Sequence, residues 1–188
     1  MLTTESTTTM SVTVDNDAAV KASAVDLSDF GAVYEKHYAA VYRFIFRRIC
    51  DTEKSFDLCS HVFLKAMENK DRFSYMGKPV LAWLYRIALN EIYMQHRKKK
   101  IEIVYHVDVN DLQNMSSDID QKNKEELENR LLSALQKLDQ QEMELIEMRY
   151  FEKQPVNMMA EVLNLTPNNV SVKLFRIIEK LKKMLTSN

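Results

Sequence analysis

Gly and Pro are unusually scarce in this chain, which contains 2 Gly and 3 Pro among 188 residues. Proteins built from β-sheets need these residues at the many turns between strands, because Gly and Pro supply the backbone angles of tight turns. With 46% hydrophobic and 28% charged residues, the chain nevertheless has the composition of a folded protein. We therefore predict an all-α fold, with room for one ordinary domain or two small ones.

Three helices are predicted in residues 29–100, where apolar side chains recur at intervals of three and four positions. Asp29 is placed to cap the first helix, and Pro79 fits the first turn of the third, where its missing N–H costs nothing. Residues 71–78 interrupt the pattern and predict a loop. The predicted helices are 30–49, 52–67 and 79–97.

Residues 124–188 show the same helical period and predict a second small domain. Asp139 and Glu142 have the spacing of a capping box at a helix start. Further along, a short helix is followed by a turn at Asn164 and by a long helix capped by Thr166. A short helix, a turn of about three residues and a second capped helix form the outline of a helix-turn-helix motif.

The net charge of −1 conceals a strong segregation of charge along the chain. Residues 1–29 carry a net −4, residues 30–100 a net +7, residues 101–129 a net −6 and residues 130–188 a net +2. Two basic blocks separated by an acidic one favour a nucleic-acid partner. Residues 1–28 lack a helical period and predict a disordered tail, and the polar, acidic residues 101–123 predict a flexible linker.

The helix-turn-helix pattern supplies candidate DNA contacts. The second helix of such a motif enters the major groove, so Asn168, Asn169 and Lys173 are candidate base readers. Arg176 is a candidate phosphate contact on the same helix. The alternative interpretation is that these residues form the ordinary solvated face of an amphipathic helix.

A second group of candidates lies around the predicted loop at 71–78. Phe73 and Tyr75 are aromatic, and basic residues surround them, a combination that suits stacking on unpaired bases. Trp83 and Tyr85 stand at helical spacing, and for them a place in the core is the stronger interpretation.

These segments resemble a known family, the extracytoplasmic-function (ECF) sigma factors, which are small alternative sigma subunits of bacterial RNA polymerase. Residues 30–100 resemble sigma domain 2 through FGAVYEKHYAAVYRF, DLCSHVFLKAMEN and AWLYRIALN. Residues 132–185 resemble sigma domain 4 through ALQKLDQQEMELIEMRYFE and MMAEVLNLTPNNVSVKLFR. The resemblance implies two helical domains, 29–100 and 124–188, joined by the acidic linker 101–123 and preceded by the tail 1–28.

The resemblance also implies partners and site residues. Domain 2 is expected to bind the clamp helices of the largest polymerase subunit through Asp57, Leu58, Ser60, His61 and Phe63. It is expected to recognise and melt the −10 promoter element, holding a flipped base, through Phe73, Ser74, Tyr75, Lys78, Arg86, Asn90 and Arg97. Domain 4 is expected to contact the flap of the second-largest subunit and to read the −35 element through Asn168, Asn169, Ser171, Lys173 and Arg176. An anti-sigma factor is a further partner that the family implies.

Several positions depart from the family pattern. Ser60 and His61 stand where the family usually has Gln and an acidic residue, which alters the expected clamp contact. Leu89 stands where Arg is usual, and Ser171 where Lys is usual. Lys153 lies near a position where the family usually has Gly. Because each lost phosphate contact removes a salt-dependent share of affinity, we expect weak unaided binding to the −35 element.

An enzyme is not expected, because the sequence has no Gly-rich phosphate loop, metal-ligand spacing or HExxH motif. We expect no cofactor and no metal. Cys50 and Cys59 fit no metal or redox spacing, and with no apolar membrane-length run they favour a cytoplasmic protein without membrane insertion. Two alternative functions remain open: a sigma-like protein recruited to DNA by a separate DNA-targeting factor, and a polymerase-independent helix-turn-helix regulator.

Overall fold

A computed structural model describes residues 29–73, 79–105 and 124–186. Its elements are α2 (Phe30–Ile49), α3 (Thr52–Glu68), a 3-10 turn η1 (Lys70–Arg72), α4 (Val80–Arg97), α6 (Lys124–Leu135), α7 (Gln140–Ile146), a π-helical turn η3 (Glu147–Phe151), α8 (Val156–Leu163) and α9 (Pro167–Thr186). The described residues contain helices and no strand, so the predicted all-α class is confirmed.

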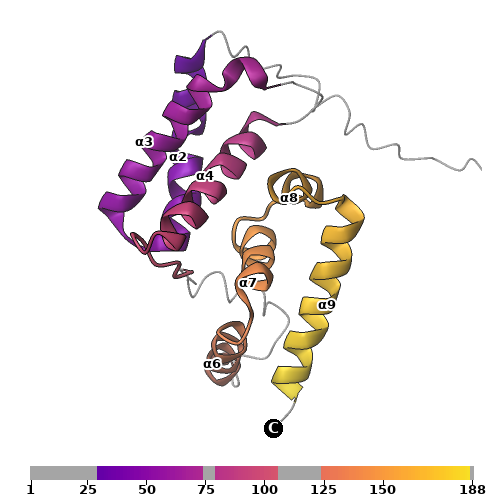
Figure 1. The fold of residues 1–188 in the computed structure, drawn as a ribbon. Coiled ribbons are helices and arrows are strands. Elements are labelled where there is room, and N and C mark those ends of the chain that lie inside the picture. Colours follow the sequence, from indigo (N-terminus) through magenta and orange to yellow (C-terminus); the bar gives the residue numbers. More distant parts are fainter. Residues whose placement is uncertain (1–28, 74–78, 106–123, 187–188) are drawn as a thin grey trace, which may run out of the picture.

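Helices α2, α3 and α4 form a three-helix bundle, drawn from indigo to magenta in Figure 1. Its helix starts follow from local chemistry. The Asp29 carboxylate accepts a hydrogen bond from the Ala32 N–H at 3.1 Å, and the Asp51 carboxylate accepts one from the Lys54 N–H at 3.0 Å. Pro79, expected inside the first turn of α4, instead immediately precedes it. Fully buried apolar side chains from all three helices fill the core: Val41, Ile45, Leu58, Val62, Leu84 and Ile92.

Helices α6 to α9 form the second group, with α9 running alongside α6, α7 and α8. The capping box is present, since Glu142 N–H donates to Asp139 at 2.8 Å and Asp139 N–H donates to Glu142 at 3.0 Å. At residue 147 this helix, α7, changes into a π-helical turn. That turn is followed by Lys153 with a positive φ of 55°, at the position near which the family usually has Gly.

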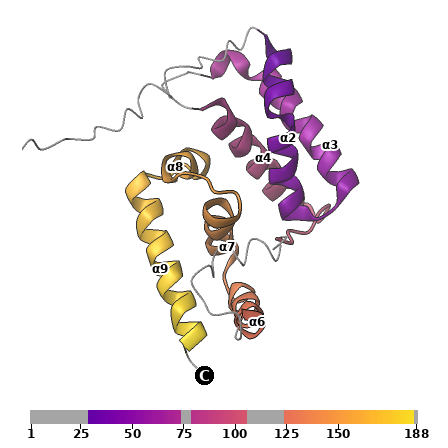
Figure 2. The same cartoon turned by 180° about the vertical axis from the view of Figure 1, so that it is seen from behind.

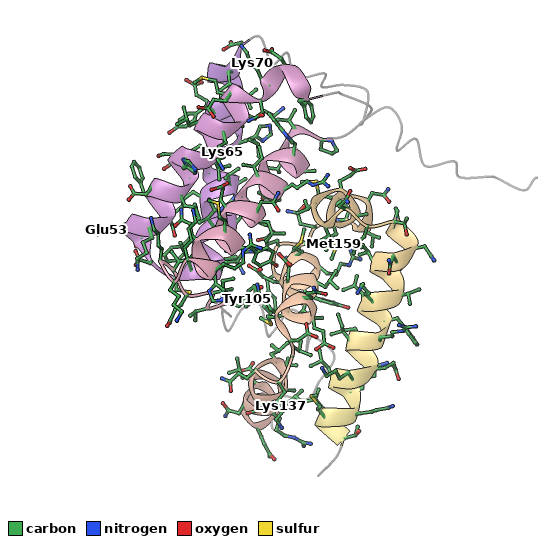
Figure 3. All side chains as sticks on the ribbon, in the orientation of Figure 1. Glu53, Lys65, Lys70, Tyr105, Lys137 and Met159 are labelled. Atoms are coloured by element: carbon green, nitrogen blue, oxygen red, sulfur yellow. The ribbon has the colours of Figure 1, made fainter. Side chains whose placement is uncertain are left out.

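The two groups of helices pack against each other through one continuous core. Figures 1 and 2, seen from opposite sides, both show α4 lying beside α8 and α7. Residues 101–105, expected in the flexible linker, pack at this boundary. Val104 N–H donates to the Arg48 carbonyl at 2.7 Å, Ile101 is buried, and Tyr105 lies beside α7 in Figure 3. Residues 1–28 and 106–123 lie outside the described residues.

Candidate polymerase and nucleic-acid interface

Helix α3 carries the residues expected to contact polymerase, and the structure divides them into two sets. Asp57 and Ser60 are exposed, and His61 is half-buried. Leu58 and Phe63 are only 1% and 3% exposed and point into the bundle. In the free chain these two side chains hold α3 in place, and their direct contact with a partner stays a prediction.

An exposed apolar stripe on α3 was missed from the sequence. Phe56, Leu64 and Met67 share one face of the helix with Ser60, and Phe56 is 57% exposed. Both Phe56 and Met67 recur at the helical spacing of the buried residues, which conceals their exposure. The buried positions, such as Val62 and Ala66, define the opposite face, so a strict helical wheel would have separated the two sets.

His61 takes part in a charged cluster that joins α3 to α4. Its Nε2 lies 3.3 Å from the buried carboxylate of Glu91, and the ammonium of Lys65 also pairs with that carboxylate. Glu91 is almost fully buried, and the ammonium of Lys65 compensates its charge. His61, which stands where the family usually has an acidic residue, thus faces the acidic side chain of Glu91 within its own domain.

Three of the expected −10 residues share one face of α4. Arg86 is half-buried, and Asn90 and Arg97 are exposed, at positions that coincide on a helical wheel. Phe73 packs on Trp83, with ring centroids 4.7 Å apart, and is half-buried. Ser74, Tyr75 and Lys78 lie outside the described residues.

The helix-turn-helix consists of α8 and α9. Asn164 adopts the left-handed conformation at the turn with φ 56°, and the Thr166 hydroxyl accepts a hydrogen bond from the Asn169 N–H at 3.2 Å, both as predicted. Buried Val170 and Leu174 fix the inner face of α9. The motif is therefore a rigid platform for its outer face.

The outer face of α9 differs in part from the expectation. Asn168, Asn169, Ser171 and Arg176 are exposed. Lys173 is half-buried instead and lines a cavity of about 380 Å³ together with Arg86 and Asn90 of α4. The structure therefore separates Lys173 from the other expected −35 residues and places it opposite the expected −10 residues.

Two apolar residues on α9 were not predicted as candidates. Val172 is 39% exposed and Phe175 is 67% exposed, on the outer face between Asn168 and Arg176. The repeat of buried residues at 170, 174, 177 and 181 was the available signal, because it puts 172 and 175 on the opposite side. Apolar side chains at such positions can contact thymine methyl groups in the major groove.

A cluster of charged side chains lies buried between the two groups of helices. The guanidinium of Arg48 on α2 lies 2.9 Å from Glu147 and 3.0 Å from Glu152. The Tyr93 hydroxyl on α4 donates to Glu144 on α7 at 2.5 Å. Burial raises the pKa of Glu144 and raises that of Glu147 to about 8, while Arg48 opposes both shifts. None of the charged residues of this cluster was singled out from the sequence.

In the part of the chain that the structure describes, no group of three or more His, Cys, Asp or Glu side chains is placed to hold a metal ion. None of the described helices combines the length and the apolar character needed to cross a membrane.

Comparisons with known families match both halves of the chain. Residues 33–101 match the Sigma-70 region 2 family, and residues 128–181 match the Sigma-70, region 4 family. Among curated relatives, the chain is 26% identical over 170 residues to the ECF RNA polymerase sigma factor BldN of Streptomyces coelicolor, covering 88% of this chain and 63% of BldN. It is 24% identical to SigW of Bacillus subtilis, covering 85% of this chain and 90% of SigW.

Two solved structures have a similar fold. One is the sigma factor RpoE from Bartonella quintana in complex with the anti-sigma factor NepR, with a TM-score of 0.55, 21% identity, and coverage of 86% of this chain and 99% of that one. The other is CnrH in complex with the cytosolic domain of CnrY, with a TM-score of 0.53, 22% identity, and coverage of 92% and 95%.

Proposed function

The chain belongs to the sigma-70 family, as a sigma factor of the ECF type, and from this premise we propose that it binds core RNA polymerase, directs it to promoters and helps to melt the −10 element. Members of this family are non-enzymatic initiation factors. The observation that carries the proposal is the order of the two family matches along one chain, each coinciding with one of the two packed groups of helices.

The proposed division of labour follows the two groups of helices. Residues 29–100 would serve as domain 2, which binds polymerase and the −10 element, and residues 124–188 as domain 4, which reads the −35 element. Residues 101–123 would link them, and residues 1–28 would form a tail. The proposed place of action is the cytoplasm, where polymerase and promoters are found.

Transcription with purified components tests this function. Core RNA polymerase and the purified chain are incubated with a library of genomic promoter fragments, and the 5′ ends of the transcripts are mapped. Promoter-specific starts that require the chain support the proposal. Failure of the chain to co-purify with core polymerase would favour the polymerase-independent regulator instead.

The polymerase contact is proposed to lie on the exposed face of α3. Asp57, Ser60 and His61 would supply its polar part, and the apolar stripe of Phe56, Leu64 and Met67 would supply buried area. Exposed large apolar side chains in a row are a common mark of a protein–protein contact. Leu58 and Phe63 would support this face from the core.

Changing Asp57 to Arg tests this contact. Asp57 is exposed, so we expect the melting temperature to stay unchanged while the affinity for core polymerase falls by about tenfold, because the charge of the contact is reversed. The measurement is a pull-down titration of core polymerase, with Glu126→Arg on α6 as the matched charge reversal. Equal affinity of the folded Asp57→Arg chain and the wild type would remove Asp57 from the contact.

Recognition of the −10 element is proposed to use Phe73, Ser74, Tyr75 and Lys78 with the face of α4. Extracting a base from the stack costs a few kcal/mol, and stacking on an aromatic side chain offsets part of this cost. Arg86, Asn90 and Arg97 would hold the unpaired strand, since cations and an amide on one helix face can follow a nucleic-acid backbone.

Reading of the −35 element is proposed to use the outer face of α9. Asn168, Asn169 and Ser171 would approach base edges with Val172 and Phe175, and Arg176 would contact phosphate. Lys173 would join them only when it is free of α4. The Ser171 hydroxyl donates to the Pro167 carbonyl at 3.0 Å, so it replaces the family's cation with a side chain that bonds its own backbone.

Changing Ser171 to Lys is expected to steepen the salt dependence of −35 binding. Few cations stand on the outer face of α9, so the wild-type slope of log affinity against log salt should be shallow, and one added phosphate contact should change it by about −0.9. The full chain is titrated against a promoter duplex at several salt concentrations, with Ser133→Lys on α6 as control. A steep wild-type slope with tight sequence-specific binding would instead indicate an autonomous −35 reader.

A second candidate function is supported by the two exposed apolar side chains on the outer face of α9. Val172 and Phe175 are suited to contact a protein partner as well as thymine. A sigma-like protein brought to DNA by a separate targeting factor would use these two side chains to bind that factor. Promoter-specific transcription with core polymerase alone excludes the need for such a factor. Relatives in fold are solved with NepR and CnrY, so an anti-sigma factor is also proposed as a partner of this chain.

A further inference from the structure

The cavity that Lys173 shares with Arg86 and Asn90 has the dimensions of a small-molecule site. Its volume is about 380 Å³, and its lining comes from α4 on one side and from α7, α8 and α9 on the other. Figures 1 and 2 both show α4 and α8 side by side at this place. We call it the α4–α9 cavity. A space of this size holds a small molecule but not a DNA strand lying along α4.

Two cations from different domains line the α4–α9 cavity. Arg86 belongs to α4 and Lys173 to α9, and both side chains are half-buried. Within the part of the chain that the structure describes, neither forms an ion pair or a side-chain hydrogen bond. A cation drawn partly out of water without a partner is costly, and an anion held between the two recovers that cost. Guanidinium and ammonium groups together are the usual ligands of phosphate.

Among the described residues of the lining, Glu144 is the one acid. The Tyr93 hydroxyl donates to one of its oxygens at 2.5 Å. Burial raises the pKa of Glu144, while the guanidinium of Arg48 opposes that rise. The lining therefore carries two cations against one carboxylate whose charge is partly compensated, so the cavity favours an anion.

The charged residues behind Glu144 do not reverse this balance. They lie around the Arg48 cluster, outside the α4–α9 cavity, and comprise more cations than carboxylates: Arg43, Arg47, Arg48, Glu147 and Glu152. The field of this cluster therefore adds no net negative charge at the cavity.

Much of the remaining lining is apolar. It consists of side chains from α4, α7, α8 and the turn that follows α8: Leu89, Leu145, Val162, Leu163 and Leu165. Leu89 stands where the family usually has Arg, so this chain has an apolar side chain at a position where its relatives carry a charge. An apolar wall gives a flat ring a surface to pack on, whereas a bare phosphate would leave that wall uncovered.

Amide groups complete the lining. Asn90 of α4 and Gln141 of α7 both line the cavity and are exposed. A side-chain amide has both donors and acceptors, which match the polar edge of a nucleobase. Cations, an apolar wall and amides together suit a molecule that carries a phosphate on one end and a flat polar ring on the other.

We propose that the α4–α9 cavity binds a mononucleotide, with its phosphate between Arg86 and Lys173 and its base against the leucine side chains. Asn90 and Gln141 bond the edge of the base. The site needs both domains, because each supplies one of the two cations. Nucleotide binding goes beyond the proposed sigma function and does not depend on it; only the competition with promoter DNA described below rests on that function.

Calorimetric titration of the full chain tests the site. The probes are AMP, GMP, CMP and UMP, the matching nucleosides, and inorganic pyrophosphate. We expect a monophosphate to bind with a stoichiometry of one, about tenfold more tightly than its nucleoside, because the nucleoside offers no anion to the cations. Pyrophosphate bound as tightly as the nucleotide would overturn the role of the apolar wall. No binding of any monophosphate at millimolar concentration would overturn the site.

Arg86→Gln and Lys173→Gln locate the phosphate. Each change is expected to weaken nucleotide binding by about tenfold, the loss of one charge-assisted hydrogen bond, while nucleoside binding stays unchanged and shows that the cavity is intact. Lys182→Gln, which breaks an exposed ion pair on α9, is the matched control and should change neither. Lys173 belongs to the other domain, so its effect separates this site from a nucleotide held by α4 alone. Wild-type nucleotide affinity in a folded Lys173→Gln chain would overturn the proposal.

Competition with DNA relates the site to the proposed function. A bound nucleotide covers Arg86 and Asn90, which are proposed to hold the −10 strand. The nucleotide at about ten times its Kd should therefore weaken binding of a single-stranded −10 oligonucleotide by about tenfold. Oligonucleotide affinity that the bound nucleotide leaves unchanged would overturn the placement of the nucleotide on Arg86.

The outcomes separate the two proposals. Nucleotide binding that depends on both cations, in a chain that gives no promoter-specific transcription, would keep the site and reject the sigma function. Promoter-specific transcription by a chain that binds no monophosphate would keep the function and reject the site.

Discussion

Replacing Tyr75 by Ala is expected to lower the yield of open complex on a fully duplex promoter by at least about tenfold. Stacking of one base on an aromatic ring is worth roughly 1–3 kcal/mol, and the melted state loses this support while the cost of unstacking remains. Reactivity of −10 thymines toward permanganate measures the melted fraction. Tyr75 lies outside the described residues, so the prediction rests on the loop position and on the family.

Two controls separate melting from folding. Tyr75→Phe retains the ring and should retain most of the open complex. On a template with a pre-melted bubble, Tyr75→Ala should be much less defective, because the cost of melting has been removed. Equal defects on both templates would assign the loop another role. Phe73→Ala is the weaker test, since Phe73 packs on Trp83 and its loss also opens a space beside α4.

Replacing Leu84 by Ala is expected to destabilise the chain by about 2–5 kcal/mol, because Leu84 is 0% exposed at the centre of the three-helix bundle. The matched control is Leu64→Ala on α3, where Leu64 is 48% exposed and the same change should cost less than about 0.5 kcal/mol. Urea unfolding followed by circular dichroism measures both.

The same pair of variants distinguishes stability from binding. Leu64→Ala should weaken the pull-down of core polymerase without loss of stability, because Leu64 belongs to the exposed stripe. Leu84→Ala should weaken it only in proportion to the unfolded fraction. A Leu64→Ala chain with wild-type affinity for polymerase would exclude the apolar stripe from the contact.

The ends of the helices could be predicted because they depend on neighbours in sequence. Asp29, Asp139 and Thr166 each bond a backbone N–H three residues ahead, and Asn164 adopts the turn conformation that suits its short polar side chain. Helical periodicity likewise predicted the three helices of residues 29–100, because it too depends on residues close together in sequence. The π-helical turn at residues 147–151 was not predicted, because no local pattern marks it.

The surroundings of the candidate site residues could be predicted less completely, for one physical reason. A period of three to four shows that a helix has two faces, but not which neighbours cover them. The family resemblance assigned Phe63 and Leu58 to a contact surface, and only the packing of the bundle shows that both are buried in the free chain while Phe56 is exposed. The residue types could be read from the sequence. Which of these side chains are buried depends on how α2 and α4 pack against α3.

Residues 30–100 and 132–185 determined by themselves the family, the helices and the outline of the DNA-binding motif, because these depend on residue types at short and regular spacings. Only the tertiary structure decided what lies between the domains. Arg48 and Glu147 are 99 residues apart in sequence, and no local spacing relates them. Their burial against each other follows from the packing of the first group of helices on the second. The same packing places Lys173 opposite Arg86, and it is set by the whole fold.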